Sequence, residues 1–182
     1  DQIWAAYGGL NSIEIKKDGD FHVKPLPVTQ EFIGDFESSL FLVYTNTQRY
    51  TSEIASSHES KNTRTKMSIK RIAKEAYRAF CAENIRTIGD LMMETWEKKK
   101  KISKHICTPE IESLEKFLLS KKVYGIKLLG SGGSGFIAVL CNKKDKKRLV
   151  SSIGKKYNVL DLRVQFNGAE NILEEKNENI IY

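Results

Sequence analysis

A loop of four glycines and two serines is the part of this sequence best suited to chemistry. Lys127-Leu128-Leu129 precedes it, and the apolar run 136–141 follows it. Glycine adopts backbone angles that other residues avoid, and its bare backbone lets another group come close. Such a loop could hold a phosphate or the phosphate-binding segment of a neighbouring domain, or it could be only a structural hairpin turn. This glycine loop comprises Gly130, Ser131, Gly132, Gly133, Ser134 and Gly135.

Two common phosphate-binding motifs do not fit this loop. Its spacing matches the G-x-G-x-x-G dinucleotide fingerprint, but that fingerprint needs a helix directly after the glycines. Residues 136–141 are apolar and partly β-branched or aromatic, which predicts a short buried strand instead. No Gly-Lys-Ser/Thr follows the loop, so it is not a Walker loop. We therefore predict a strand, the glycine loop and a second strand.

Three charged residues could act beside such a loop, and each has an ordinary alternative. The Asp1 carboxylate could orient a hydroxyl and accept its proton, or it could cap a helix. Arg49 lies in a polar loop after an apolar run and could bind a phosphate through both guanidinium nitrogens, or it could be a surface arginine. Lys127 could face a phosphate or simply lie at a strand edge.

Cysteine and histidine spacing predicts no metal site within this chain. There is no C-x-x-C, and the histidines are not spaced as metal ligands, so we expect reduced thiols in a cytoplasmic protein. The apolar run 136–141 is far too short to cross a bilayer, so we expect no membrane partner. The residues considered are Cys81, Cys107, Cys141, His22, His58 and His105.

The chain of 182 residues has a formal charge of +7, concentrated in the runs 98–101 and 143–148. Such runs are usually solvated helix faces, although they can also attract nucleic acid or a phosphorylated substrate. The strand that begins at Phe136 faintly resembles one of an RNA-recognition motif, but Ala138 stands where a second stacking aromatic is required. We therefore keep a basic nucleic-acid-binding module as the alternative and do not expect a nucleic-acid partner.

The predicted elements surround the loop with helices in the centre and strands at both ends. This order favours an α+β fold with a mainly antiparallel sheet and helices packed on one face. Trp96 and the pair Met92-Met93 are expected in the core. We predict helices at 1–7, 52–61, 65–80, 88–96, 108–118 and 143–153, strands at 10–15, 21–26, 40–45, 136–141 and 159–166, a strand directly before the glycine loop, and a turn at Asp18-Gly19.

Four segments together resemble the C-terminal half of the GHMP small-molecule kinases. They are most similar to the D-glycero-D-manno-heptose 7-phosphate kinases of that superfamily. The segments are D-Q-I-W-A-A-Y-G-G-L-N at 1–11, threonine-x-x-x-arginine at 45–49, tryptophan followed by lysines at 96–100, and K-L-x-G-x-G-G-x-G-F at 127–136.

The resemblance implies a fold, a reaction and roles for particular residues. It implies the ferredoxin-like GHMP C-terminal domain over 16–182, with 1–15 ending the catalytic N-terminal domain. The reaction would be phosphorylation of the anomeric hydroxyl of heptose 7-phosphate, with ATP and Mg²⁺ as cofactors and the sugar phosphate as partner. Asp1 would be catalytic, the glycine loop would lie near the phosphates, and Arg49 and Lys127 would bind substrate.

One expectation concerns the chain by itself. In the superfamily the main ATP-phosphate loop precedes the catalytic aspartate, and here the sequence begins at Asp1. We therefore expect a fragment that neither binds ATP well nor turns over sugar alone. A non-catalytic interaction domain descended from such a kinase is a further alternative.

Overall fold

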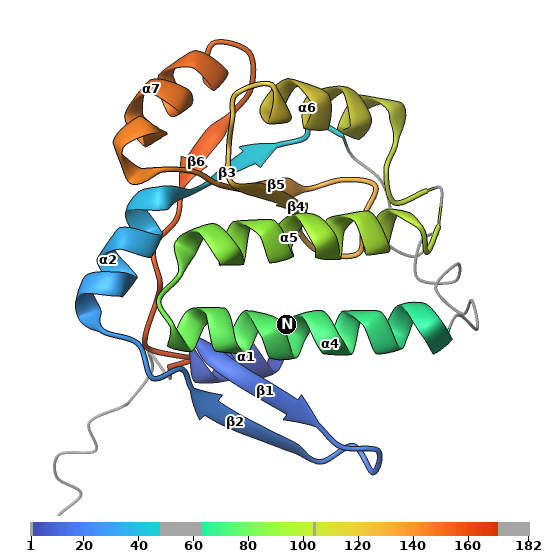
Figure 1. Ribbon diagram of the computed structural model, residues 1–182. Coiled ribbons are helices and arrows are strands. Elements are labelled where there is room, and N and C mark those ends of the chain that lie inside the picture. The colour runs from blue at the N-terminus through green and yellow to red at the C-terminus, as the bar shows by residue number, and fades with distance from the viewer. Residues whose placement is uncertain (1, 48–62, 104, 171–182) are drawn as a thin grey trace, which may run out of the picture. The chain divides into compact units, whose positions relative to one another are not determined.

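Residues 2–47, 63–103 and 105–170 are described by the computed structural model (Figure 1). The chain divides into two units, Asp1–Leu26 with Val164–Tyr182, and Pro27–Arg163. Each unit is described by itself below. None of the described helices is both long enough and apolar enough to cross a membrane.

Among its described residues, the smaller unit has one short helix and one hairpin. Gly8 ends the helix with φ +65°, and a Cβ at Gly8 would lie 2.7 Å from the backbone of Asn167, so only glycine fits there. The hairpin turn is the predicted one, with Gly19 at φ +92°. The elements are α1 (Gln2–Tyr7), β1 (Asn11–Ile15) and β2 (Phe21–Pro25), and β1 pairs antiparallel with β2.

The larger unit is built on a four-stranded sheet in the order β4-β5-β3-β6, with every neighbouring pair antiparallel. Along the chain the order is strand, helices, two strands, helix, strand, which is the split β-α-β arrangement of ferredoxin-like folds. The predicted α+β class with an antiparallel sheet is therefore confirmed. The strands are β3 (Leu40–Tyr44), β4 (Gly125–Leu128), β5 (Phe136–Leu140) and β6 (Val159–Asp161).

Helices cover both faces of this sheet, whereas the sequence prediction placed them on one. Alternate residues of a strand point to opposite faces, so Phe41 and Val139 face one way and Leu40 and Ala138 the other. The first face packs against α6 (Pro109–Leu119) and α7 (Lys143–Ile153), and the second against α2 (Gln30–Ser39), α4 (Thr63–Cys81) and α5 (Ile85–Lys100). Both faces are apolar because both are buried. The apolar pattern of a strand does not show which helix covers which face.

The structure contains a helix that the sequence prediction did not include, α2 (Gln30–Ser39). Thr29 caps it by accepting a hydrogen bond from the Phe32 N–H at 3.1 Å, and Phe32, Ile33 and Phe36 form its buried face. A threonine cap before apolar residues at helical spacing was a readable signal. The predicted helix at 52–61 lies outside the described residues, and β6 is shorter than predicted.

Helix α5 (Ile85–Lys100) runs along the open edge of β4. Gly89 of α5 and Gly125 of β4 come so close that a Cβ on Gly125 would lie 2.0 Å from the Gly89 oxygen. Farther along, the Ile126 N–H, which points out of the sheet edge, donates to the Met93 Sδ at 3.3 Å. The helix thereby covers an edge that would otherwise expose unpaired backbone groups.

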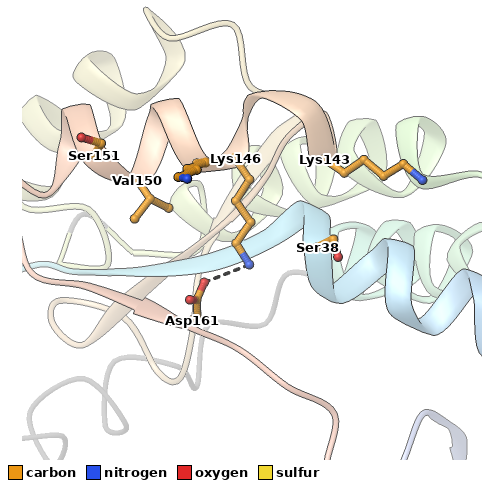
Figure 2. Close-up of a pocket in the computed structure, with 7 residues that line it drawn as sticks. Ser38, Lys143, Lys146, Val150, Ser151 and Asp161 are labelled. Atoms are coloured by element: carbon orange, nitrogen blue, oxygen red, sulfur yellow. Dashed lines mark ion pairs between the residues drawn. The ribbon is translucent and has the colours of Figure 1, made fainter.

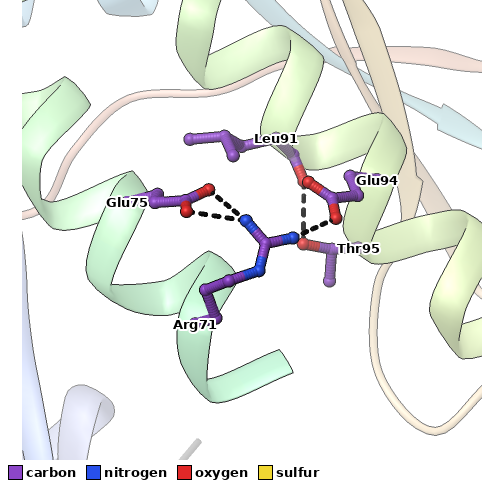
Figure 3. A network of polar contacts seen from close by, with 5 residues as sticks. All are labelled: Arg71, Glu75, Leu91, Glu94 and Thr95. Atoms are coloured by element: carbon purple, nitrogen blue, oxygen red, sulfur yellow. Dashed lines mark hydrogen bonds and ion pairs between the residues drawn. The ribbon is translucent and has the colours of Figure 1, made fainter. Parts of the chain in front are cut away.

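A charged network joins α5 to α4 (Thr63–Cys81) (Figure 3). Arg71 of α4 donates to both carboxylate oxygens of Glu75, at 2.6 and 2.7 Å, and also to Glu94 of α5. Since all three side chains are about one third exposed or more, solvent screens these pairs and they add little to stability. As predicted, Trp96 of α5 lies in the core, where it is 1% exposed.

Candidate functional site: the glycine loop

The glycine loop connects β4 to β5, so the predicted order of strand, loop and strand is confirmed. All four glycines have positive φ: +68° at Gly130, +117° at Gly132, +75° at Gly133 and +101° at Gly135. Side chains with a Cβ rarely adopt these angles, so the loop's path requires glycine at these positions.

The end of β3 holds one side of the loop. The Thr45 N–H donates to the Gly135 oxygen at 2.9 Å, and the Thr45 hydroxyl donates to the same oxygen at 3.0 Å. The Thr47 hydroxyl donates to the Gly133 oxygen at 3.3 Å. Two of the segments used for the family resemblance, 45–49 and 127–136, are therefore in direct contact.

A second segment holds the loop's centre. The Gly133 N–H donates to the Ile106 oxygen at 2.9 Å, and a Cβ on Gly132 would come within 3.0 Å of the Ile106 side chain. Ile106 is fully buried. The buried Glu115 carboxylate steadies this segment, because it accepts a hydrogen bond from Lys100 at 2.7 Å and lies 3.9 Å from the Cys107 Sγ.

Lys99, near the end of α5, holds the start of the loop. Its ammonium group donates to the Leu128 oxygen at 3.4 Å and to the Gly130 oxygen. Burial, followed by the positive charge of nearby Lys127, lowers the pKa of Lys99 to about 8. Lys99 is one of four consecutive lysines, and nothing in the sequence around it distinguishes it from its neighbours.

We expect Lys99 to titrate near pH 8 in the folded chain, against an ordinary pKa of 10.5. Because the folded state then binds fewer protons than the unfolded state between these values, this residue makes the free energy of unfolding rise with pH across that window. Carbon-13 NMR of the lysine Cε groups checks it, with the Lys99 resonance assigned by its loss in Lys99→Met. A midpoint above pH 10 would refute the expectation.

The loop's N–H groups are only partly used. In the part of the chain that the structure describes, the N–H groups of Ser131, Gly132 and Ser134 donate to no protein acceptor. Successive free N–H groups on a glycine-rich turn form a site for an anion. Burial also lowers the pKa of Lys127, and neither Lys127 nor Lys99 has a carboxylate partner among the described residues. The loop is therefore an electropositive region with donors available.

A shallow pocket of about 360 Å³ adjoins the loop. Its aromatic wall consists of Tyr44 and Phe136, whose ring centroids are 5.2 Å apart and which directly precede Thr45 and follow Gly135. An apolar pocket beside free N–H groups suits a ligand that combines a ring with a phosphate. The lining residues are Tyr44, Phe136, Asn158, Val159 and Leu160.

Another depression, of about 510 Å³, lies beside α7 and does not include the loop (Figure 2). Two of its three lysines have acidic partners: Lys146 pairs with Asp161 at 2.9 Å, and Lys143 pairs with Asp35 at 2.7 Å. These pairs offset much of the positive charge that favoured the nucleic-acid alternative. We therefore place the candidate site at the glycine loop.

The remaining predicted site residues are distributed as follows. Lys127 is half-buried on β4, in register with Ala138 of β5. Asp1 and Arg49 lie outside the described residues. Over residues 2–47, 63–103 and 105–170, no group of three or more histidine, cysteine or acidic side chains could hold a metal ion.

The chain is similar in sequence to known kinases. The family model described as GHMP kinases C terminal matches residues 76–159. A curated D-glycero-alpha-D-manno-heptose 7-phosphate kinase of Campylobacter jejuni is 24% identical over 160 residues, which cover 85% of this chain and 47% of that relative.

Solved structures of similar fold include two kinases of this kind. A D-glycero-D-manno-heptose 1-phosphate kinase from Bacteriodes thetaiotaomicron has a TM-score of 0.65 at 22% identity, over 92% of this chain and 46% of that one. The L. major mevalonate kinase in complex with R-mevalonate has a TM-score of 0.64 at 20% identity, over 92% of this chain and 52% of that one. The chain thus spans about half the length of the relatives it matches. Residues 76–159 thus match the C-terminal domain of the GHMP kinases, and the described fold is the one that these solved structures share.

Proposed function

We propose that this chain forms the C-terminal part of an ATP-dependent sugar kinase that phosphorylates the anomeric hydroxyl of D-glycero-D-manno-heptose 7-phosphate. The observation that carries the proposal is the glycine loop, which three separate segments hold in place while the N–H groups of Ser131 and Ser134 have no described acceptor. Phosphoryl transfer asks a protein mainly for positioning and for stabilisation of charge, and a rigid loop of N–H donors supplies both.

The residues take the following roles in this proposal. The glycine loop lies against the phosphates, and Lys127 adds positive charge beside it. Arg49, which follows the loop-binding Thr45 and Thr47 along the chain, binds the sugar phosphate through its planar guanidinium. Asp1 orients the attacking hydroxyl and accepts its proton.

The described residues fit part of what ATP and Mg²⁺ require. The free N–H groups and unpaired lysines near the loop fit a phosphate group. ATP would supply the transferred phosphoryl group, and Mg²⁺ would neutralise charge on its phosphate oxygens. The described residues offer no carboxylate cluster for Mg²⁺, so we propose that the metal is held by the phosphates and by residues beyond those described.

The choice of sugar rests on the relatives rather than on the fold. The curated relative is named as a heptose 7-phosphate kinase, whereas a mevalonate kinase shares the same fold. A fold hosts many substrates, and the site decides among them. The aromatic pocket beside the loop is compatible with a sugar ring and does not by itself distinguish heptose from galactose or fucose.

The test is a kinase assay of the complete protein that contains these residues, with ATP, Mg²⁺ and a panel of sugar phosphates and free sugars. We expect turnover with heptose 7-phosphate to exceed that with the other sugars. The 182 residues alone should give no turnover, since they span about half the length of the kinases they match. Absence of phosphoryl transfer to every sugar by the complete protein would refute the proposed function. Transfer to a different sugar would refute only the substrate.

A further inference from the structure

We propose that Lys99 and Thr47 are positioning residues that orient two peptide groups of the glycine loop, so that the N–H groups of Ser131 and Ser134 are presented to a phosphate. The inference deepens the proposed function and rests on it for the identity of the ligand. It concerns the two bonds from side chains to loop carbonyls, neither of which the motif pattern identifies.

A hydrogen bond to a carbonyl also orients the N–H group of the next residue. A peptide group is planar and trans, so the carbonyl of one residue and the N–H of the next point in opposite directions. The loop already shows this beside Lys99: the Leu128 carbonyl accepts from Lys99, and the Leu129 N–H points the other way, to the Phe136 oxygen at 2.9 Å. Lys99 therefore fixes the orientation of that peptide plane.

The same side chain orients the Gly130–Ser131 peptide. The Gly130 carbonyl accepts from the Lys99 ammonium, so the Ser131 N–H points away from Lys99. Here no described acceptor receives the N–H. A charged donor on the carbonyl also polarises the peptide and makes its N–H a stronger donor.

Thr47 acts in the same way on the Gly133–Ser134 peptide. The Gly133 carbonyl accepts from the Thr47 hydroxyl at 3.3 Å, so the Ser134 N–H points away from Thr47, again with no described acceptor. The Thr47 oxygen lies 2.8 Å from the Thr45 hydroxyl, whose single proton is shared between Thr47 and the Gly135 oxygen. The two side chains thus leave the Ser131 and Ser134 donors available at fixed orientations.

The glycines make the hydrogen bonds from Lys99 and Thr47 necessary. Residues without a Cβ can rotate through both signs of φ, so a loop with four glycines does not by itself keep two particular N–H groups directed at a ligand. Pre-organised donors bind a charged group without having to reorient first, which is the gain that positioning residues provide.

The test uses the nitrogen-15-labelled 182-residue chain and inorganic pyrophosphate as the probe, with the amide signals of Ser131 and Ser134 followed by NMR. In the unmodified chain both signals should shift and saturate. Lys99→Met should weaken binding about tenfold, the effect of losing one hydrogen bond from a charged group. Lys99→Arg should bind within about threefold of the unmodified chain, because guanidinium can still donate to both carbonyls.

Matched controls separate orientation from simple charge and from folding. Lys101→Met removes the same charge from the exposed residue that ends α5, and binding should stay nearly unchanged. Thr47→Val should reduce the Ser134 shift more than the Ser131 shift, whereas Thr47→Ser should retain both. Amide signals outside 127–135 and away from the substituted residue should match those of the unmodified chain, which shows that each variant is folded.

Two outcomes would overturn the inference. One is an unmodified chain whose Ser131 and Ser134 signals do not respond to pyrophosphate. The other is that Lys99→Met and Lys101→Met weaken pyrophosphate binding equally. That result would attribute the loss to long-range charge and not to orientation of the peptide. If pyrophosphate binds as expected but the complete protein phosphorylates no sugar, the proposed function fails and this inference stands. If the complete protein phosphorylates a sugar but Lys99→Met binds pyrophosphate normally, the proposed function stands and this inference fails.

Discussion

Asp1→Asn in the complete protein is expected to lower turnover about 10²–10⁴-fold and to leave the KM for the sugar nearly unchanged. Asparagine has nearly the shape of aspartate but cannot accept a proton, so the substitution removes help that is needed mainly in the transition state. Steady-state kinetics at varied sugar concentration separate the two parameters. Asp1 lies outside the described residues, so this experiment addresses its role directly.

Asp18→Asn is the matched control for that result. Asp18 lies in the β1–β2 turn, where its carboxylate accepts from the Asp20 N–H at 3.1 Å, and asparagine can make the same turn. The control should retain normal turnover. If Asp1→Asn keeps near-native turnover as well, Asp1 is not the base, and the reaction needs another proton acceptor.

Gly125→Ala is expected to destabilise the larger unit by about 3–5 kcal/mol. The added Cβ would lie 2.0 Å from the Gly89 oxygen and 2.6 Å from its carbonyl carbon, so β4 and α5 would have to separate. Separation would also strain the Ile126–Met93 and Lys99–Leu128 hydrogen bonds along the same edge. Since domains are stable by only about 5–15 kcal/mol, urea unfolding followed by circular dichroism should show a large drop in the midpoint.

Gly34→Ala provides the opposite control. Gly34 is inside α2, and an added Cβ would meet no atom within 4 Å. Alanine is the better helix former, so this variant should be more stable by about 0.5–1 kcal/mol. Equal midpoints for the two variants would show that the close approach of α5 and β4 does not constrain the fold.

Local patterns in the sequence were sufficient to predict elements whose structure depends on a few neighbouring residues. Thr108-Pro109 begins α6 as predicted, with the Thr108 hydroxyl accepting from the Ile111 N–H at 3.4 Å. The basic helix was predicted with the bounds it has, Lys143–Ile153. Caps, periodicity and glycine positions are properties of a few neighbouring residues, so they can be read without a tertiary structure.

The positions of helices relative to the sheet could not be read in this way. Ala138 and Val139 are adjacent apolar residues, yet they contact different sets of helices on opposite faces. A strand that is buried on both faces carries no polar alternation to show which helix covers which face. That assignment depends on how the whole chain folds back on itself, and it accounts for the error of placing the helices on one face.

The sequence by itself determined the glycine loop and the strands on either side of it, because these depend on residue types at short spacings. Only the tertiary structure decided which distant groups hold the loop: Thr47, Ile106 and Lys99 all reach it from other elements. One lysine in a run of four differs from the others only by what it contacts after folding, and long-range contacts leave no local pattern in a single sequence.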